Sequence, residues 1–136
     1  MRQKIRFLAL LAVIILLCGC QGRPLPEGMD EETLLSRGRE VAILLAGGSY
    51  EEVWEQMRED VAAGVKVEDI QKLVLTQAND AGTYRQIESA MATGQSSDGE
   101  EYGVAVFYCD YSKKKMLFRL AFDTNYELIG IEIKKT

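Results

Sequence analysis

The chain has 136 residues, enough for one domain and a short additional segment, and it contains no histidine. Its 47% hydrophobic and 27% charged residues exclude a wholly disordered or fibrous protein, and the missing imidazole excludes histidine-based catalysis and metal binding. Without the three bases at the start, 13 bases stand against 21 acids, so the remainder carries a charge of −8 and we expect no nucleic-acid partner.

Residues 1–19 are predicted to be the signal peptide of a lipoprotein. Three bases precede an unbroken apolar run of 11 residues from Phe7 to Leu17, and small residues follow. As a helix this run spans about 17 Å at ~1.5 Å per residue, too short for a hydrocarbon core of about 30 Å. A short membrane anchor or a buried helix is the alternative, but a buried helix seldom opens a chain with three cations.

The end of the apolar run, Leu17-Cys18-Gly19-Cys20, resembles the bacterial lipobox, in which a Leu and a small residue precede an obligatory Cys. The resemblance implies cleavage after Gly19 and a diacylglyceryl group on the thiol of Cys20. Cys18 fits less well because two bulky leucines precede it. Two acyl chains anchor a protein stably, so we expect the lipid bilayer as a partner and a location on the extracytoplasmic side of the cell membrane.

Residues 20–30 are expected to comprise the acylated cysteine and a flexible tether. Both prolines of the chain and two glycines fall in this segment, and these residues disfavour regular structure. A tether of about ten residues reaches roughly 30 Å. A single domain, residues 31–136, is expected to follow it.

Three amphipathic helices are predicted at the start of this domain, because apolar side chains recur at helical spacing between capping residues and glycines. Asp30 is expected to cap the first helix, and Gly47-Gly48 to end it. Ser49 is expected to cap the second, with Glu52 completing a capping box. The three helices are expected at residues 31–46, 50–61 and about 67–81.

From Tyr84 the apolar period changes to two, which predicts antiparallel strands. The composition of Gly94–Gly99 indicates a loop, and Asp123–Tyr126 a tight turn in which Asn125 takes a positive φ. The second strand is apolar on both faces, which is typical of the middle of a sheet. The strands are expected at residues 84–93, 102–111, 115–123 and 126–134.

Helices followed by three or four antiparallel strands form an α+β fold, with three N-terminal helices expected on one face of the sheet. Five short sequence features follow one another along the chain: Gly47-Gly48, Tyr50–Val53, Gly82 before Ile87, Phe122-Asp123 and Leu128–Ile131. In this pattern, over about residues 31–136, the chain is similar to the family catalogued as domain of unknown function 3887. The resemblance implies a nuclear transport factor 2-like, cystatin-like cone, and no assigned activity.

A cone of this kind can hold a ligand between its sheet and its helices. The residues expected to line such a cavity are Tyr50, Trp54, Tyr108 and Asp123. A small lipid-anchored enzyme of the isomerase, dehydratase or hydrolase type would use carboxylate and tyrosine groups there. Alternatively, Tyr50 and Trp54 are core residues and Asp123 is a turn residue that accepts hydrogen bonds from nearby backbone, which we favour because histidine is absent.

The other reactive groups point to no cofactor and no metal. The acidic clusters at residues 30–32 and 98–101 lack the ligand spacing of a calcium loop, and Cys109 lies in an apolar stretch typical of a buried thiol. Lys113–Lys115 is expected to keep a hairpin turn soluble; contact with anionic lipid or cell-wall polymer is the second interpretation. The sequence thus favours a non-catalytic module that binds a protein, a peptide or a small molecule.

Overall fold

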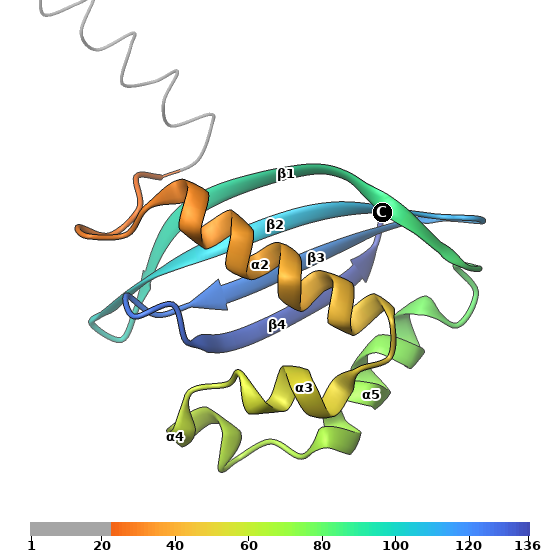
Figure 1. Ribbon diagram of the computed structural model, residues 1–136, viewed down its shortest axis with the longest axis horizontal. Coiled ribbons are helices and arrows are strands. Elements are labelled where there is room, and N and C mark those ends of the chain that lie inside the picture. Colours follow the sequence, from red (N-terminus) through yellow and green to blue (C-terminus); the bar gives the residue numbers. More distant parts are fainter. Residues whose placement is uncertain (1–22) are drawn as a thin grey trace, which may run out of the picture.

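The computed structural model describes residues 23–136, so the predicted signal peptide and Cys20 lie outside the described residues. The predicted α+β fold is confirmed, with the helices preceding an antiparallel sheet (Figure 1). The helices are α2 (Glu31–Ala46), α3 (Tyr50–Glu55), α4 (Glu59–Ala62) and α5 (Val67–Ala78). The strands are β1 (Tyr84–Ser97), β2 (Glu100–Tyr111), β3 (Lys115–Phe122) and β4 (Leu128–Lys135).

The sheet has the strand order β1-β2-β3-β4, with each strand antiparallel to the next. As its sequence predicts, β2 is an inner strand with apolar residues on both faces. Ala105 and Phe107 lie on the face toward α2, and Val104 and Val106 lie on the opposite face. Helix α2 crosses one face, while α3, α4 and α5 lie beyond β4 (Figure 1).

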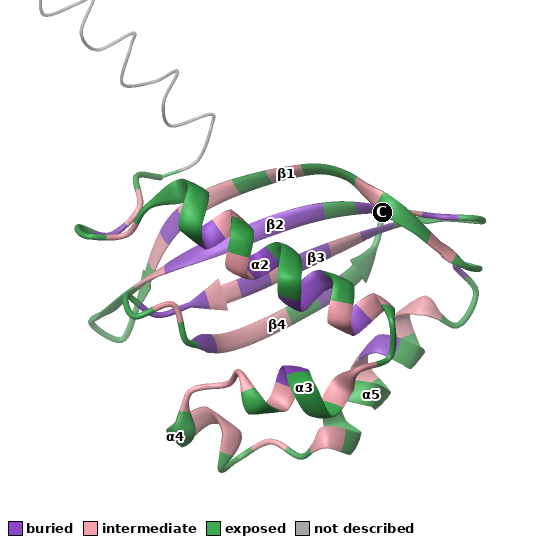
Figure 2. Ribbon diagram, in the orientation of Figure 1, coloured by how far each residue is buried: buried purple, intermediate pink, exposed green. Residues whose placement is uncertain are grey.

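The core lies between the sheet and the helices, mainly α2, and it includes Val53 of α3 and Ile70 and Val74 of α5. Figure 2 shows buried residues along β2 and β3 and on α2. The contact is so close that a Cβ atom on Gly38 of α2 would lie 2.7 Å from the Cβ of Ala105. The largest fully buried side chains are Phe107, Phe118, Phe122, Leu34, Leu45, Met116, Leu120 and Leu128. Each contributes about 1.5–3 kcal/mol by burial, and together they fill the space between helix and sheet.

The predicted second helix is interrupted, which is a correction to the sequence analysis. Helix α3 ends at Glu55, and the next residues form a parallel bridge between Met57 and Leu128. The Leu128 N–H donates to the Gln56 carbonyl at 3.2 Å, and the Arg58 N–H donates to the Leu128 carbonyl at 2.9 Å. These bonds to β4 replace helical bonds while Met57 still packs on the core, so the apolar spacing continues across the break.

The ends of two helices also differ from the prediction. The Ser49 side chain makes no capping hydrogen bond, so the expected capping box is not formed, and α5 ends at Ala78 rather than near Ala81. At the first helix the prediction is confirmed, because an Asp30 carboxylate oxygen accepts from the Thr33 N–H at 2.9 Å.

The predicted loop at residues 94–99 is mostly strand. β1 continues to Ser97, and only Asp98 and Gly99 form the turn, with φ values of 51° and 81°. Two residues with positive φ match the twist of a tight hairpin. In the β3–β4 turn, Tyr126 rather than Asn125 has the positive φ, 62°, and its hydroxyl accepts from the Asp30 N–H at 2.7 Å.

Residues 23–26, which the sequence suggests are part of a flexible tether, lie against the edge of β1; we call them the strap. The Gly94 N–H donates to the Arg23 carbonyl at 3.0 Å, and the Arg23 N–H donates to Thr93 Oγ1 at 3.0 Å. A side chain on Gly94 would collide with the Pro24 carbonyl, and Pro26 is buried. The strap is therefore part of the fold. No helix among residues 23–136 is long and apolar enough to cross a membrane.

Candidate functional site

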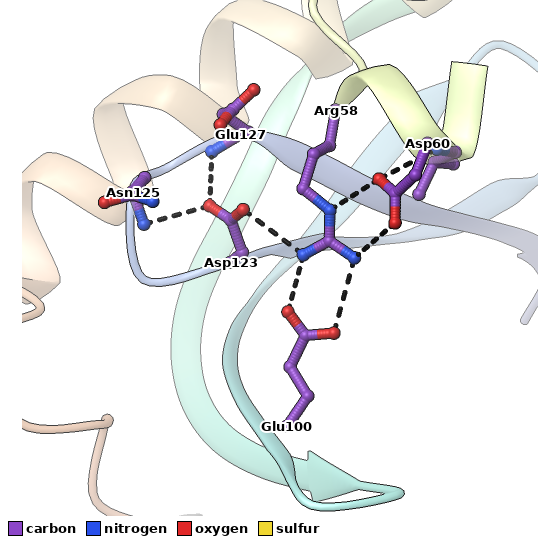
Figure 3. A network of polar contacts seen from close by, with 7 residues as sticks. Arg58, Asp60, Glu100, Asp123, Asn125 and Glu127 are labelled. Atoms are coloured by element: carbon purple, nitrogen blue, oxygen red, sulfur yellow. Dashed lines mark hydrogen bonds and ion pairs between the residues drawn. The ribbon is translucent and has the colours of Figure 1, made fainter. Parts of the chain in front are cut away.

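Asp123 lies in the β3–β4 turn, where it is only 5% exposed. Its Oδ1 accepts from the backbone N–H groups of Asn125 and Glu127, both at 2.9 Å, and its Oδ2 accepts from Arg58 Nη1 at 3.3 Å (Figure 3). A general base needs an acceptor free to take a proton from a substrate. Oδ1 of Asp123 holds the turn and Oδ2 binds Arg58, so both oxygens have structural partners, as in the alternative in which Asp123 is a turn residue.

Arg58 joins the helices to two hairpin ends. Its Nε and Nη2 donate to the two carboxylate oxygens of Asp60 at 2.7 and 3.1 Å, and its Nη1 also binds Glu100 (Figure 3). The hydrogen bonds that Arg58 donates to Asp60 and Glu100 raise the pKa of Arg58, and the bond from Arg58 lowers the pKa of Asp60. The sequence analysis missed Arg58 because Glu100 and Asp123 lie 42 and 65 residues away along the chain.

Tyr50 and Trp54 lie in α3, and both are partly buried against the core. The Trp54 Nε1–H donates to the Val65 carbonyl at 2.7 Å, which fixes the indole between helices. Helix α3 contacts α2 and α5. The two aromatic residues therefore belong to the helical part of the molecule.

Tyr108 lies on the opposite side of the sheet from α2 and is 39% exposed. The four residues expected to line one cavity are thus divided among α3, the β3–β4 turn and the uncovered side of the sheet. The structure does not bring them together, and of the four only Tyr108 faces the uncovered side.

We call the sheet face opposite α2 the open face. Its central residues are Met91, Thr93, Tyr102, Val104, Val106, Tyr108, Leu117, Arg119 and Ala121. Val104 and Val106 are only 3% and 6% exposed, although no helix covers them. Val106 pairs with Met91 on one side and Arg119 on the other, so longer side chains of neighbouring strands flank it. The open face has an apolar centre with a polar surround.

A pocket of about 220 Å³ lies on the open face. The residues around it include Gln95, Tyr102, Val104, Arg119, Ala121 and Glu132. The Tyr102 hydroxyl donates to Gln95 Oε1 at 3.1 Å. Arg119 stands opposite Glu132 in the sheet register, but Glu132 pairs with Lys134 at 3.0 Å. Within residues 23–136, the Arg119 guanidinium makes no ion pair and no hydrogen bond.

A larger hollow of about 450 Å³ lies between the strap and the end of β1. Its charged residues Arg23, Glu27 and Glu101 are exposed to solvent. Arg119 in the smaller pocket is half-buried, and a partly desolvated charge binds a counter-ion more strongly than an exposed one. We therefore regard the open-face pocket as the candidate site.

The remaining reactive groups have local partners or are buried. Burial raises the pKa of the Cys109 thiol to about 11, so it stays protonated at neutral pH. Lys114 pairs with Asp80 at 2.9 Å, and Lys115 pairs with Glu88 at 2.9 Å. Among residues 23–136, no three or more acidic or cysteine side chains are grouped so as to hold a metal ion.

Comparison with known proteins adds a family and a fold. The family model described as protein of unknown function (DUF3887) matches residues 39–131. The structure is similar to the NMR structure of a protein from Ruminococcus gnavus ATCC 29149, with a TM-score of 0.68, 21% identity, and coverage of 81% of this chain and 96% of that chain. No curated protein matches the sequence. At this identity the likeness shows the fold alone.

Proposed function

We infer that this chain, which belongs to the family of proteins of unknown function DUF3887, is a lipid-anchored binding module on the extracytoplasmic side of a bacterial cell membrane. The family description names no activity, so the proposal rests on the residues of the chain itself. It has two parts, a lipid on Cys20 and a non-catalytic binding surface on the open face.

The uncovered, partly apolar side of the sheet is the observation that carries the binding role. Helices bury the other side, while Tyr108 and Met91 on the open face are each 39% exposed around the buried Val104 and Val106. An apolar centre with polar groups at its edge is typical of ligand and protein binding surfaces. The small pocket with Arg119 lies within this surface, and the occupant we assign to it is derived below.

The arrangement of polar groups gives no support to the alternative of a small enzyme. That alternative needs a carboxylate and a tyrosine hydroxyl around one cavity. Asp123 is engaged by Arg58 and by two backbone N–H groups, and Tyr108 lies on the open face.

Metabolic labelling with an alkyne analogue of palmitate tests the lipid anchor. The full chain, expressed in a bacterium, is expected to take up the label, and Cys20→Ser to lose it. Cys18→Ser is the matched control, because it removes a thiol two residues away, and it should remain labelled. Labelling of Cys20→Ser, or loss of the label in Cys18→Ser alone, would contradict the assignment.

A ligand screen tests the binding surface. The full-chain protein in detergent micelles is mixed with small anions, cations and neutral molecules, and binding is followed by saturation-transfer NMR of the ligands. Ala121→Glu, which places a carboxylate in the open-face pocket, should abolish binding of the molecules that the parent binds. Ile43→Glu, a matched change at a 51% exposed apolar residue of α2, should not. Equal binding to Ala121→Glu, or conversion of a molecule into product, would contradict a binding role of the open face.

A further inference from the structure

We propose that the open-face pocket binds the carboxylate of a small apolar ligand through the guanidinium of Arg119. This inference rests on the proposed function, because it names the ligand chemistry of the same binding surface. The apolar part of the ligand would lie against Val104 and Ala121, which also line the pocket.

The position of Arg119 is the first argument. It lies in β3, between Val106 of β2 and Glu132 of β4, and it is half-buried beside the pocket. A guanidinium presents a planar fork of N–H donors that matches the two oxygens of a carboxylate. Within residues 23–136 no side chain uses that fork, so its donors are available to a ligand.

The surroundings of Arg119 explain why its charge is not neutralised by the protein. Glu132 is its direct cross-strand neighbour, but the carboxylate of Glu132 binds Lys134 Nζ at 3.0 Å. Tyr102 uses its hydroxyl proton on Gln95 Oε1, which leaves the amide N–H groups of Gln95 without a partner among residues 23–136. Arg119 and Gln95 therefore supply the pocket with N–H donors, and donors favour an anion.

The size of the pocket indicates which group it can hold, and because the pocket is open to solvent the rest of a ligand can extend beyond it. Its volume of about 220 Å³ is below the ~300–1,000 Å³ typical of pockets for drug-sized molecules. A group of the size of one amino-acid residue fits this space. A short branched carboxylic acid and the C-terminal residue of a peptide both offer a carboxylate beside a small apolar group.

Isovalerate and isovaleramide test the proposal, because they share a shape and differ in charge. The full-chain protein in detergent micelles is titrated with each, and the dissociation constants are measured by saturation-transfer NMR. Isovalerate is expected to bind at least about tenfold more tightly than the amide, since hydrogen bonds to a charged group are the stronger ones. Equal affinity for acid and amide would overturn the proposal without need of any variant.

Variants assign the effect to Arg119. Arg119→Gln should weaken isovalerate binding at least about tenfold, and Arg119→Lys should weaken it less, because it keeps the charge and loses the fork. Arg85→Gln removes the same charge from an exposed position at the other end of β1 and should leave the affinity unchanged. Equal losses in Arg85→Gln and Arg119→Gln would show a general effect of charge and overturn the assignment.

A peptide distinguishes the two sources of the carboxylate. Acetyl-Ala-Ala-Val is titrated with a free and with an amidated C-terminus. Tighter binding of the free peptide than of isovalerate identifies a chain terminus, and equal binding identifies a small acid; preference for the amidated peptide would overturn the proposal. If ligands other than acids bind to the parent and not to Ala121→Glu, the proposed function stands and only the carboxylate assignment fails.

Discussion

The two faces of the sheet are made by the same strands but differ in what covers them. On the face toward α2, Phe107, Phe118 and Phe122 are fully buried. On the open face, Val104 and Val106 are buried only by side chains of the sheet itself, and Tyr108 remains 39% exposed. The comparison indicates a division of roles, in which the covered face supplies most of the stability and the binding role proposed above falls on the open face.

The largest expected effect separates the two faces directly. Phe118→Ala empties a fully buried site and should lower the free energy of unfolding by about 3–5 kcal/mol. Tyr108→Ala, at a partly exposed site, should lower it by about 1 kcal/mol or less. Urea denaturation of both variants checks this, and similar midpoints would contradict the division of roles.

A second test concerns the polar contacts that close one end of the covered face. Asp123→Ala leaves two backbone N–H groups without their acceptor and removes one of the three carboxylates that bind Arg58, so it should cost about 2–3 kcal/mol. Asp123→Asn keeps an acceptor for the backbone and loses only the charge, so it should cost less. Thermal unfolding measures both. Isovalerate binding should persist in Asp123→Asn, and a folded variant without it would assign Asp123 to the site.

Two glycine-to-alanine variants compare the packing on the two faces of the sheet, one at Gly38 of α2 and one at Gly130 of β4. A Cβ on Gly38 would lie 2.7 Å from the Cβ of Ala105 on the covered face, so Gly38→Ala should destabilise by about 1–3 kcal/mol despite the gain in helix propensity. A Cβ on Gly130 would meet the Cβ of Ala121 at 3.4 Å on the open face. Gly130→Ala should therefore lie within about 1 kcal/mol of the parent. Chemical denaturation at neutral pH compares them, and a reversed order would contradict the packing described here.

The smallest effect at neutral pH comes from two buried ionisable groups, which lower the stability only in alkali. Burial raises the pKa of Cys109 from 9.0 to about 11 and that of Tyr111 from 10.0 to about 12. In the unfolded chain the Cys109 thiol and the Tyr111 hydroxyl lose their protons at a lower pH than in the folded protein. The stability that these two groups contribute is therefore fully present below pH 9 and falls as the pH rises toward 11. Urea midpoints from pH 8 to 11 measure the fall, and Cys109→Ala should reduce it. A rise in stability over this range would show that the two groups are not buried as neutral species.

Local signals predicted much of the fold, and non-local contacts account for the rest. The capping of α2 by Asp30 and the two apolar faces of β2 can be predicted from the sequence, because they depend on residues nearby in the chain. The Asp98-Gly99 pair also carried a hairpin signal, which the polar composition around it obscured. The break after α3 was not predictable in this way, since it depends on a bridge from Met57 to Leu128.

The candidate site likewise has one feature that follows from the local sequence and others that depend on contacts between distant residues. Strand alternation places Arg119 on the face opposite Phe118, which the sequence predicts. Glu132 binds Lys134 and leaves Arg119 without a carboxylate partner. This choice of partner depends on side-chain geometry, which cannot be predicted from the spacing of residues in the sequence. The network of Arg58 with Asp123 has the same origin, because its members meet only once the sheet is assembled.

The strap also sets how a lipid on Cys20 would hold the domain. Because Arg23 is bonded to the edge of β1, only Gln21 and Gly22 separate Cys20 from the fold, a span of about 10 Å at ~3.3–3.6 Å per residue. The end of the sheet with the β1–β2 turn would then rest next to the lipid headgroups. Tyr111, the last residue of β2, lies eight positions beyond Gly103, the partner of Gly94, which is roughly 26 Å at ~3.3 Å each. The turn with Lys113–Lys115 follows Tyr111 and would point away from the bilayer. Such an anchor would limit the height of the domain above the membrane and place the lysine turn at the end of the sheet that is farther from the lipid.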